Sequence, residues 1–347
     1  MSSYPARIRW GIIGCGDVTE IKSGPAFSKV SGSELVAVMR RDGSKAADYA
    51  RRHGVARWYD DARALVADPE VDAVYVATPP GAHLDGALLT AAAGKPCYVE
   101  KPFARSTAEC DAIVSAFRTT GAPVFVAYYR RCLPRFTQVK ALLAENALGT
   151  VTNIRLHFAC PAPVITDPAS PPWRLDAINA GAGLFLDLGS HALDLFDFLF
   201  GPLLNVHGRA ANLATPLPIE DAVAMTFTTA SGALGAATWN FASAIPADEV
   251  VIEGTVGRLS FSVFGNEPLR FQTRDGLQTF DRPNPQHVQQ PLIQTVVDAL
   301  LGRGECPSTG ESARRTSVVM DVVLDAYYGG RTDAFWTRPA TWPGRRV

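Results

Sequence analysis

The largely apolar segment DLGSHALDLFDFLFG at residues 187–201 carries several polar side chains, three of which have a regular spacing. Asp187, His191 and Asp194 follow one another at steps of four and three residues, a spacing that places side chains on one face of a helix. Three kinds of site fit: a metal centre, an acid/base pair facing a substrate, or polar groups satisfied within the fold, with Asp187 as the helix N-cap. No other His or Cys is spaced to complete a metal site, so we predict that no metal is bound.

The pair Asp187 and His191 suits proton transfer to or from a hydroxyl group. Histidine ordinarily titrates near neutral pH, so His191 would act as the base in an oxidation and as the acid in a reduction. Asp187, one helical turn earlier, would orient the imidazole ring or tune it electrostatically, and could cap the helix as well. We interpret Asp194 as a supporting or substrate-binding group.

A second candidate for chemistry is Lys101, in the sequence CYVEKP. It directly follows an apolar run that predicts a parallel strand, and open parallel sheets bind ligands at the carboxyl ends of their strands. Its ammonium group could donate a hydrogen bond to the oxygen of an alcohol or carbonyl that exchanges a hydride with a nicotinamide. A lysine at a strand end is more often a surface residue, so the position alone leaves both interpretations open.

A glycine turn lies between the first predicted strand and the first predicted helix, in GIIGCGDVTE. Gly14 and Gly16 would let backbone N–H groups and the helix N-terminus approach a pyrophosphate, so we predict dinucleotide binding by these glycines and by Asp17 and Val18. The third position of the fingerprint is Thr19 instead of Gly or Ala. The alternative is a tight strand-to-helix turn without a ligand.

The end of the second predicted strand reads AVMRRD. Arg40 stands where NAD-binding sites commonly place a carboxylate for the ribose 2′-hydroxyl, and Arg41 follows it. Guanidinium groups suit a 2′-phosphate, so we predict NADP as the preferred cofactor, with NAD as the alternative. In that alternative both arginines are solvated and Asp42 binds the ribose.

The elements that position these residues change character along the chain. Over the first third, short apolar strands alternate with helical patterns, which predicts a doubly wound parallel sheet covered on both faces, an α/β domain. Later strands alternate or are rich in aromatic residues and are joined by short turns, which predicts an α+β domain with a mostly antiparallel sheet. We expect a dinucleotide-binding domain at residues 1–127 and a substrate-binding and oligomerisation domain at residues 128–347, whose last helix covers the sheet or packs back on the first domain.

The composition excludes several classes of partner. Among 347 residues, 47% are hydrophobic and 19% are charged, and the net charge of −1 offers no basic excess for nucleic acid or an anionic membrane. No apolar run approaches the roughly 18 residues of a membrane span, and no secretory signal precedes the first strand. The six cysteines form no CxxC pair and are interpreted as reduced, so we expect a cytoplasmic protein.

Five motifs in this order resemble the Gfo/Idh/MocA oxidoreductases, the group of glucose–fructose oxidoreductase and inositol dehydrogenase. They are GIIGCGD, VATPPGAH, YVEKPFA, DLGSHALD and EGTVGRL. The resemblance runs from about residue 7 to the last helix, and it implies a Rossmann domain, a second domain with a large open sheet and a nicotinamide cofactor. It also implies a small-molecule sugar, cyclitol or related polyol as substrate, and a homodimer or homotetramer built through the open sheet.

The resemblance also assigns roles to individual positions. Lys101 matches the catalytic lysine, and Asp187 with His191 matches the acid/base pair. Glu100 and Pro102 match positions that shape the nicotinamide end. The residues that match the segment bordering the cofactor are Thr78, Pro79 and His83. The chain departs from the family pattern at Thr19 and Arg40, which affects the cofactor and not the chemistry.

Substrate contacts are expected from two further places. Trp173 and Arg174 precede the helix of His191, so the indole could stack on a sugar face, or the loop could simply pack on its own aromatic residue. Tyr129, between Tyr128 and Arg130, leaves the last strand of the first sheet on the ligand side and would bind substrate or fix the domain junction. The histidines without a partner at useful spacing are interpreted as structural or exposed: His53, His157, His207 and His287.

Three functions remain open from the sequence. The leading one is an NAD(P)-dependent dehydrogenase or reductase in which Lys101 polarises the reacting oxygen and His191, oriented by Asp187, transfers the proton. The second is a glycoside hydrolase of the same family, which oxidises its substrate transiently with NAD and shows no net redox change. The third is a non-catalytic dinucleotide sensor, which would need the glycine turn but not Lys101, Asp187 and His191 together.

Overall fold

The computed structural model describes residues 6–346, which form two compact units. The first unit consists of the chain up to Ala104, Ala108–Leu133 and Pro285–Arg314, and the second consists of Arg105–Thr107, Pro134–Asn284 and the chain from Arg315 onward. Residues 285–314 therefore group with the N-terminal part of the chain although they lie far from it in sequence. The predicted boundary at residues 127 and 128 stays a prediction about the functional domains.

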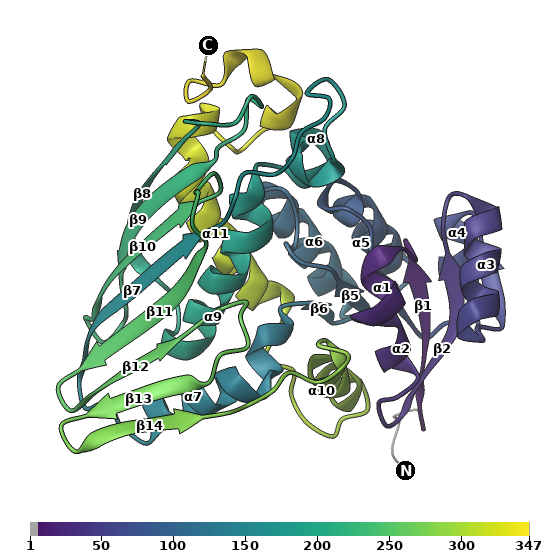
Figure 1. Ribbon diagram of the computed structural model, residues 1–347. Helices are drawn as coiled ribbons and strands as arrows, with labels where there is room; N and C mark the ends of the chain where they lie inside the picture. Colours follow the sequence, from purple (N-terminus) through teal and green to yellow (C-terminus); the bar gives the residue numbers. More distant parts are fainter. Residues whose placement is uncertain (1–5, 347) are drawn as a thin grey trace. The chain divides into compact units, whose positions relative to one another are not determined.

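The first unit is built on a parallel sheet that, within residues 6–346, has six strands in the order β3-β2-β1-β4-β5-β6 (Figure 1). This is the strand order of doubly wound dinucleotide-binding folds. The strands are β1 (Ile8–Ile13), β2 (Ser33–Met39), β3 (Arg57–Tyr59), β4 (Ala73–Val76), β5 (Cys97–Val99) and β6 (Val124–Val126). The helices are α1 (Asp17–Ile21), α2 (Gly24–Phe27), α3 (Gly43–His53), α4 (Ala62–Ala67), α5 (His83–Ala92), α6 (Thr107–Thr120) and α10 (Gln290–Leu300), with short helices η1 (Pro80–Ala82) and η2 (Tyr129–Cys132).

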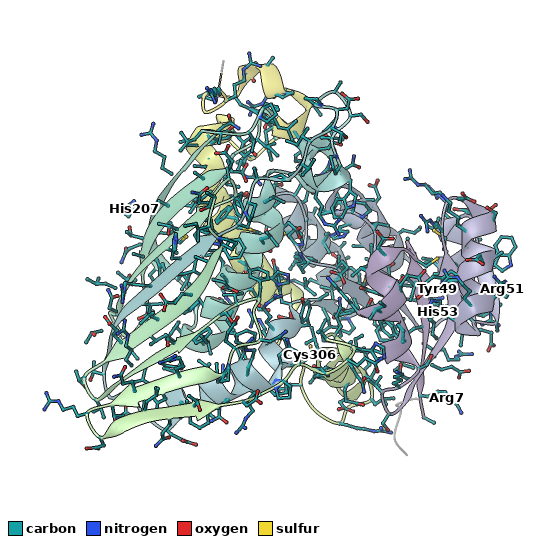
Figure 2. All side chains as sticks on the ribbon, viewed as in Figure 1. Arg7, Tyr49, Arg51, His53, His207 and Cys306 are labelled. Atoms are coloured by element: carbon teal, nitrogen blue, oxygen red, sulfur yellow. The ribbon has the colours of Figure 1, made fainter. Side chains whose placement is uncertain are left out.

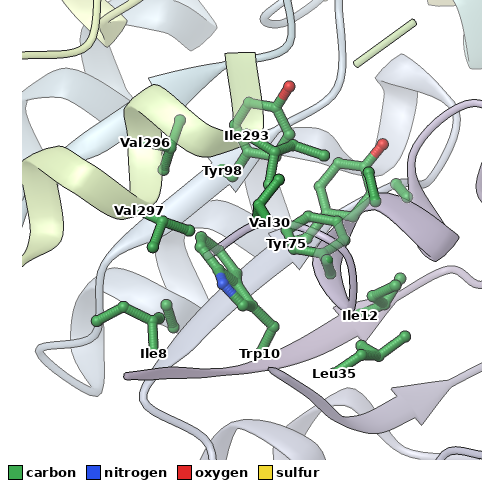
Figure 3. Close-up of a cluster of buried hydrophobic side chains, with 14 of the residues drawn as sticks. Ile8, Trp10, Ile12, Val30, Leu35, Tyr75, Tyr98, Ile293, Val296 and Val297 are labelled. Atoms are coloured by element: carbon green, nitrogen blue, oxygen red, sulfur yellow. The ribbon is translucent and has the colours of Figure 1, made fainter. Parts of the chain in front are cut away.

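One side of this sheet shares its core with α10 (Figure 3). Trp10 of β1 and Tyr98 of β5 are fully buried there, together with Ile293 and Val297 of α10. The rings of Tyr75 and Tyr98 lie 5.0 Å apart, and both phenol oxygens lie inside the unit. Buried tyrosine hydroxyls require hydrogen-bond partners, so this core carries a polar centre.

The second unit is built on a sheet that, in the described part of the chain, has eight strands in the order β14-β13-β12-β11-β7-β10-β9-β8. Its pairs are antiparallel except for β7 with β10. The strands are β7 (Val151–Ala159), β8 (Leu204–Ala211), β9 (Ala222–Thr228), β10 (Leu234–Asn240), β11 (Ala247–Gly254), β12 (Gly257–Phe261), β13 (Leu269–Thr273) and β14 (Gly276–Phe280). The helices are α7 (Pro134–Ala144), α8 (Ala177–Ala180), α9 (Ser190–Phe200) and α11 (Gly310–Tyr328), with η3 (Trp173–Leu175), η4 (Phe185–Gly189), η5 (Phe335–Thr337) and η6 (Pro339–Thr341).

Helices α7, α9 and α11 lie along one face of this sheet (Figure 1). Strand β10 shows the resulting alternation, because Trp239 points to the buried side while Ala236 and Thr238 are exposed on the other. His207 of β8 is also exposed (Figure 2). The predicted fold class, a doubly wound parallel domain with an α+β domain and a large, mostly antiparallel sheet, is confirmed.

The structure corrects one local expectation and decides one alternative that the sequence left open. The single helix expected after the glycine turn is two short helices, because the chain breaks at Ser23 and Pro25 occupies the first turn of α2. Asp187 is not an N-cap: it lies inside η4, a π-helical turn that continues directly into α9. Such turns are rare and occur frequently at functional sites.

Gly189, at the end of the π-helical turn, is in direct contact with an aromatic ring. A Cβ atom on Gly189 would lie 2.4 Å from Cδ2 of Phe185, which is fully buried. The Phe185 ring in turn packs edge-on against Trp239 at 4.9 Å between ring centroids. The turn that carries Asp187 toward His191 therefore depends on a residue without a side chain at position 189.

We expect Gly189→Ala to lower the free energy of unfolding by about 1–3 kcal/mol, because the added methyl group must displace Phe185 from a packed core. Chemical denaturation followed by tryptophan fluorescence measures this change. Gly304→Ala is the matched control: a Cβ atom there meets no other atom within 4 Å, so we expect a change within about 0.5 kcal/mol. Equal unfolding midpoints for the wild type and Gly189→Ala would show that Phe185 moves aside freely.

Candidate active site

The two glycines of the β1–α1 turn have different structural requirements. Gly14 has φ +89°, and a Cβ atom there would lie 2.7 Å from Cγ2 of Thr78. Gly16 has φ −147°, which any residue adopts, and a Cβ atom there would approach only the carbonyl oxygen of Gly14, at 3.8 Å. The fold itself thus requires Gly14. Open space lies in front of Gly16 at the start of α1, which fits a pyrophosphate approaching the backbone.

Thr19 explains the departure from the glycine fingerprint. Its hydroxyl donates to the carbonyl oxygen of Gly16 at 2.7 Å, and its Oγ1 accepts from the Gly16 N–H at 3.1 Å. The hydroxyl of Tyr49, on α3, donates to the Thr19 carbonyl oxygen at 2.8 Å (Figure 2). Thr19 therefore closes the turn with hydrogen bonds, so the turn keeps its shape without a third glycine.

The end of β2 presents arginine instead of a carboxylate. Within residues 6–346 the guanidinium of Arg40 donates one hydrogen bond, to the Cys15 carbonyl oxygen at 3.4 Å, and Arg41 is exposed. Asp42 is the N-cap of α3, where its Oδ1 accepts from the hydroxyl of Ser44 at 2.6 Å. Hydrogen bonds from the Ser44 side chain and the Lys45 backbone lower the pKa of Asp42. The carboxylate that would bind a ribose is thus already engaged by its own helix.

His83 joins two segments that the sequence assigns to the cofactor border. It is fully buried, with Nε2 at 2.8 Å from the Thr78 carbonyl oxygen and Nδ1 at 3.0 Å from the Pro102 carbonyl oxygen. Burial lowers the pKa of His83, although the contact with the Thr78 backbone opposes this. His83 therefore braces the segment of Thr78 and Pro79 against the segment of Lys101 and Pro102, and its ring does not face outward.

Glu100 also connects separate segments, at the carboxyl ends of the same parallel strands. Its side chain is buried, and its Oε1 accepts hydrogen bonds from Tyr75 Oη and from Gln289 Nε2, both at 2.5 Å. Its Oε2 accepts from the backbone N–H of Lys101 at 3.0 Å. Neither Tyr75 nor Gln289 belongs to a motif with a fixed spacing from Glu100, from which they are separated by 25 and 189 positions, so the sequence gives no signal for either contact.

The second unit gathers the predicted acid/base and loop residues. Asp187 is half-buried and pairs with Arg174, with 3.6 Å between Oδ2 and Nε, and the guanidinium of Arg174 lies 4.4 Å from the centre of the Trp173 ring. His191 is 4% exposed, and its ring packs edge-on against Phe264 at 5.7 Å. The polar stripe of the opening segment is therefore enclosed within the fold and is not a solvated helix face.

The remaining predicted residues differ in exposure. Asp194 is 1% exposed and Tyr128 is fully buried, whereas Tyr129 is half-buried under the guanidinium of Arg130, 5.0 Å from its ring centre. The first unit thus holds Lys101, Glu100, Thr78, His83 and Tyr129, and the second holds Trp173, Arg174, Asp187, His191 and Asp194.

No group of three or more His, Cys, Asp or Glu side chains in residues 6–346 is arranged to hold a metal ion. Within the same part of the chain, no helix has both the length and the apolar character needed to cross a membrane.

Comparison with known proteins gives matches over most of the chain. Residues 8–128 match the family model described as an oxidoreductase family with an NAD-binding Rossmann fold, and residues 136–260 match the GFO/IDH/MocA C-terminal domain. Oxidoreductase P35 of Formosa agariphila is 36% identical over 320 residues, covering 91% of this chain and 98% of the relative. A trans-1,2-dihydrobenzene-1,2-diol dehydrogenase of Danio rerio is 28% identical over 257 residues, covering 73% of each chain.

Among solved structures, levoglucosan dehydrogenase in complex with NADH superimposes with a TM-score of 0.82 at 22% identity and covers 92% of this chain and 96% of that chain. This likeness concerns the fold. The two family models and the relative that matches almost from end to end confirm what the five motifs indicated. The chain belongs to the Gfo/Idh/MocA family of NAD-binding oxidoreductases.

Proposed function

We propose that this chain is an NADP-preferring dehydrogenase or reductase that acts on a carbon bearing a hydroxyl or carbonyl group in a sugar, cyclitol or related polyol. The observation that carries the proposal is the braced segment Glu100–Lys101 at the carboxyl end of β5. A lysine with no role beyond solvation at the surface would not require its backbone to be fixed by a buried carboxylate, which is itself held by a tyrosine and a distant glutamine.

Each side chain has a part in such a reaction. The bound cofactor takes up or supplies the hydride. The Lys101 ammonium donates a hydrogen bond to the reacting oxygen and stabilises the charge that develops on it. His191 accepts the hydroxyl proton in the oxidative direction and returns it in the reductive direction. Asp187, paired with Arg174, sets the electrostatic surroundings of the imidazole.

The Trp173–Arg174 pair supports a small hydroxylated substrate. Trp173 is 37% exposed, and its indole offers an apolar face on which a sugar ring can stack. Arg174 contributes hydrogen-bond donors beside that face. Relatives named for a dihydrobenzene diol and for levoglucosan are consistent with a substrate of this class.

Assembly and location belong to the same proposal. The exposed face of β10 carries Leu234, Ala236 and Thr238, a surface of small and apolar side chains through which a homodimer or homotetramer can form. The six cysteines are all free, which supports a cytoplasmic location.

Lys101→Ala is expected to lower kcat by about 10²- to 10³-fold, because the transition state loses a donor to its charged oxygen. Cofactor reduction measured on a panel of sugars, cyclitols and dihydrodiols, with NADP and NAD in parallel, checks this. Lys22→Ala, at an exposed lysine, is the control and should match the wild type. Release of free sugar without accumulation of reduced cofactor would replace the proposal with the hydrolase alternative, and tight cofactor binding without turnover would replace it with the sensor.

Arg40→Asp is expected to lower kcat/KM for NADP by about 10- to 100-fold and to spare NAD, because charge-assisted hydrogen bonds to the 2′-phosphate contribute about 1.5–3 kcal/mol. Initial rates with both cofactors measure the ratio. Arg51→Ala removes a guanidinium that pairs with Asp48 on α3, and should leave the ratio unchanged (Figure 2). A wild-type enzyme that prefers NAD would contradict the role given to Arg40.

The two turn glycines should separate folding from binding. Gly16→Ala should keep the unfolding free energy within about 0.5 kcal/mol while weakening dinucleotide binding about tenfold or more, which is at least about 1.4 kcal/mol. Gly14→Ala should destabilise the free protein by about 1–3 kcal/mol, because φ +89° is strained for alanine. Thermal unfolding and cofactor titration measure the two effects, and unchanged binding by Gly16→Ala would refute the pyrophosphate assignment.

A further inference from the structure

Residues 285–300, which we call the strap, attach to the segment that follows the glycine turn. Nδ1 of His287 lies 2.6 Å from the Ile21 carbonyl oxygen, at the end of α1, and its Nε2 lies 2.5 Å from Nζ of Lys29. The backbone N–H of Gln289 donates to the Lys22 carbonyl oxygen at 3.2 Å. These contacts give His287 partners that its sequence spacing did not indicate, and they place Gln289 beside α1.

The side chain of Gln289 points into the polar centre of the first unit. It is 1% exposed, its Nε2 donates to Oε1 of Glu100 at 2.5 Å, and its Oε1 accepts from the hydroxyl of Tyr98 at 3.0 Å. Tyr75 donates to the same Glu100 oxygen. Burial raises the pKa of both tyrosines well above the usual value, so their hydroxyls remain protonated and act as donors.

Glu100 depends on these donors because little water reaches it. Removing one partner of a buried charged group leaves the group unsatisfied and costs more than the hydrogen bond contributes. A glutamate that loses the Gln289 amide would turn toward another donor or toward solvent. Its Oε2 would then leave the Lys101 N–H, and the peptide that carries Lys101 would lose its anchor.

The position of this anchor connects it to one end of the cofactor. The half of the sheet that contains β1 and β2 holds the glycine turn and Arg40, and the other half contains β4 and β5, after which Lys101 follows. Dinucleotides bind across such sheets with one nucleotide on each half. The nicotinamide therefore belongs to the half that Glu100 and Lys101 occupy.

We propose that Gln289, assisted by Tyr75, is a positioning residue that holds the Glu100 carboxylate and thereby fixes the Lys101 peptide at the nicotinamide end. This inference rests on the proposed function, in which Lys101 donates to the reacting oxygen. The strap thus has a second role besides covering the apolar core: it supplies a polar contact that sets the geometry of the reacting end.

Another strap residue provides a matched control. Gln294 also docks the strap, since its Oε1 accepts from the Ser31 N–H at 2.8 Å and its Nε2 donates to the Ser31 carbonyl oxygen at 3.2 Å. These two hydrogen bonds end on the loop before β2, a third goes to Asp298 within the strap at 3.1 Å, and none of them involves Glu100. Gln289→Leu and Gln294→Leu therefore each remove two docking hydrogen bonds, and only the first should disturb the nicotinamide end.

The experiment compares both variants with the wild type by two measurements at a pH above neutrality. We expect Gln289→Leu to lower kcat by about 10- to 100-fold with little change in substrate KM, as small displacements of a reacting group do. We also expect weaker binding of reduced dinucleotide, followed by nicotinamide fluorescence, with unchanged binding of ADP-ribose and its 2′-phosphate, which lack the nicotinamide. Gln294→Leu should match the wild type in both measurements.

Two additional variants exclude a purely structural role. Gln289→Glu keeps the volume but replaces the amide donor with a carboxylate, so positioning predicts a loss as large as that of Gln289→Leu, whereas a packing role predicts near-wild-type behaviour. Tyr75→Phe removes the second donor to Glu100, together with a contact to the hydroxyl of Ser23 at 3.1 Å. It should cause a smaller loss of the same kind even if the Gln289 variants fold poorly.

The binding measurement separates the two proposals. If the wild type turns over a polyol and the Gln289 and Tyr75 variants bind and react like Gln294→Leu, the positioning role is wrong and the proposed function stands. If no substrate turns over, the proposed function fails, and selective weakening of dinucleotide binding over the ADP-ribose fragments still supports the anchor at the nicotinamide end. Equal weakening of dinucleotide and fragments overturns it.

Discussion

A carboxylate can be buried only if donors meet its oxygens, and in the first unit this requirement falls on Glu100. The donors come from the strand beside it, from the peptide that follows it and from the N-cap residue of α10, which lies 189 positions later in the chain. Around this carboxylate, Tyr75 and Tyr98 give the core a polar centre, while Trp10 and Ile293 supply the apolar surroundings. The arrangement links the glycine turn, through α1 and the strap, with the lysine at the end of β5.

Close packing determines how the second unit accommodates its buried polar groups. Gly189 lies against Phe185, Phe185 against Trp239, and the π-helical turn between them carries Asp187. A helix that is buried nearly all round accommodates polar groups only where each has a place in the packing. The polar stripe of η4 and α9 is accordingly enclosed by this packing.

Much of the fold could be predicted because its signals are local. The apolar runs of β1, β2 and β4 end in glycine, arginine and proline, and their alternation with helices determines a parallel sheet. The sequence does not predict strands β8 and β14, because they lie at the edges of their sheet and are polar and exposed along most of their length. The site residues found from motifs were those with a fixed spacing. Gln289 and Tyr75 have none, since only the folded sheet brings them to Glu100, and the closure of the turn by Thr19 depends on hydrogen bonds that sequence spacing does not reveal.

Because the first unit is built from separate stretches of the chain, it cannot complete its core early in synthesis. Translation proceeds from the N-terminus, and domains commonly fold as they leave the ribosome. The chain up to Leu133 contains every strand of the parallel sheet, but the apolar side of Trp10 and Tyr98 stays uncovered until α10 has been synthesised. The apolar face of the nascent sheet therefore stays exposed while the segment Pro134–Asn284 of the second unit is translated. A chaperone would therefore have the largest exposed apolar surface to protect while residues 133–300 are being translated.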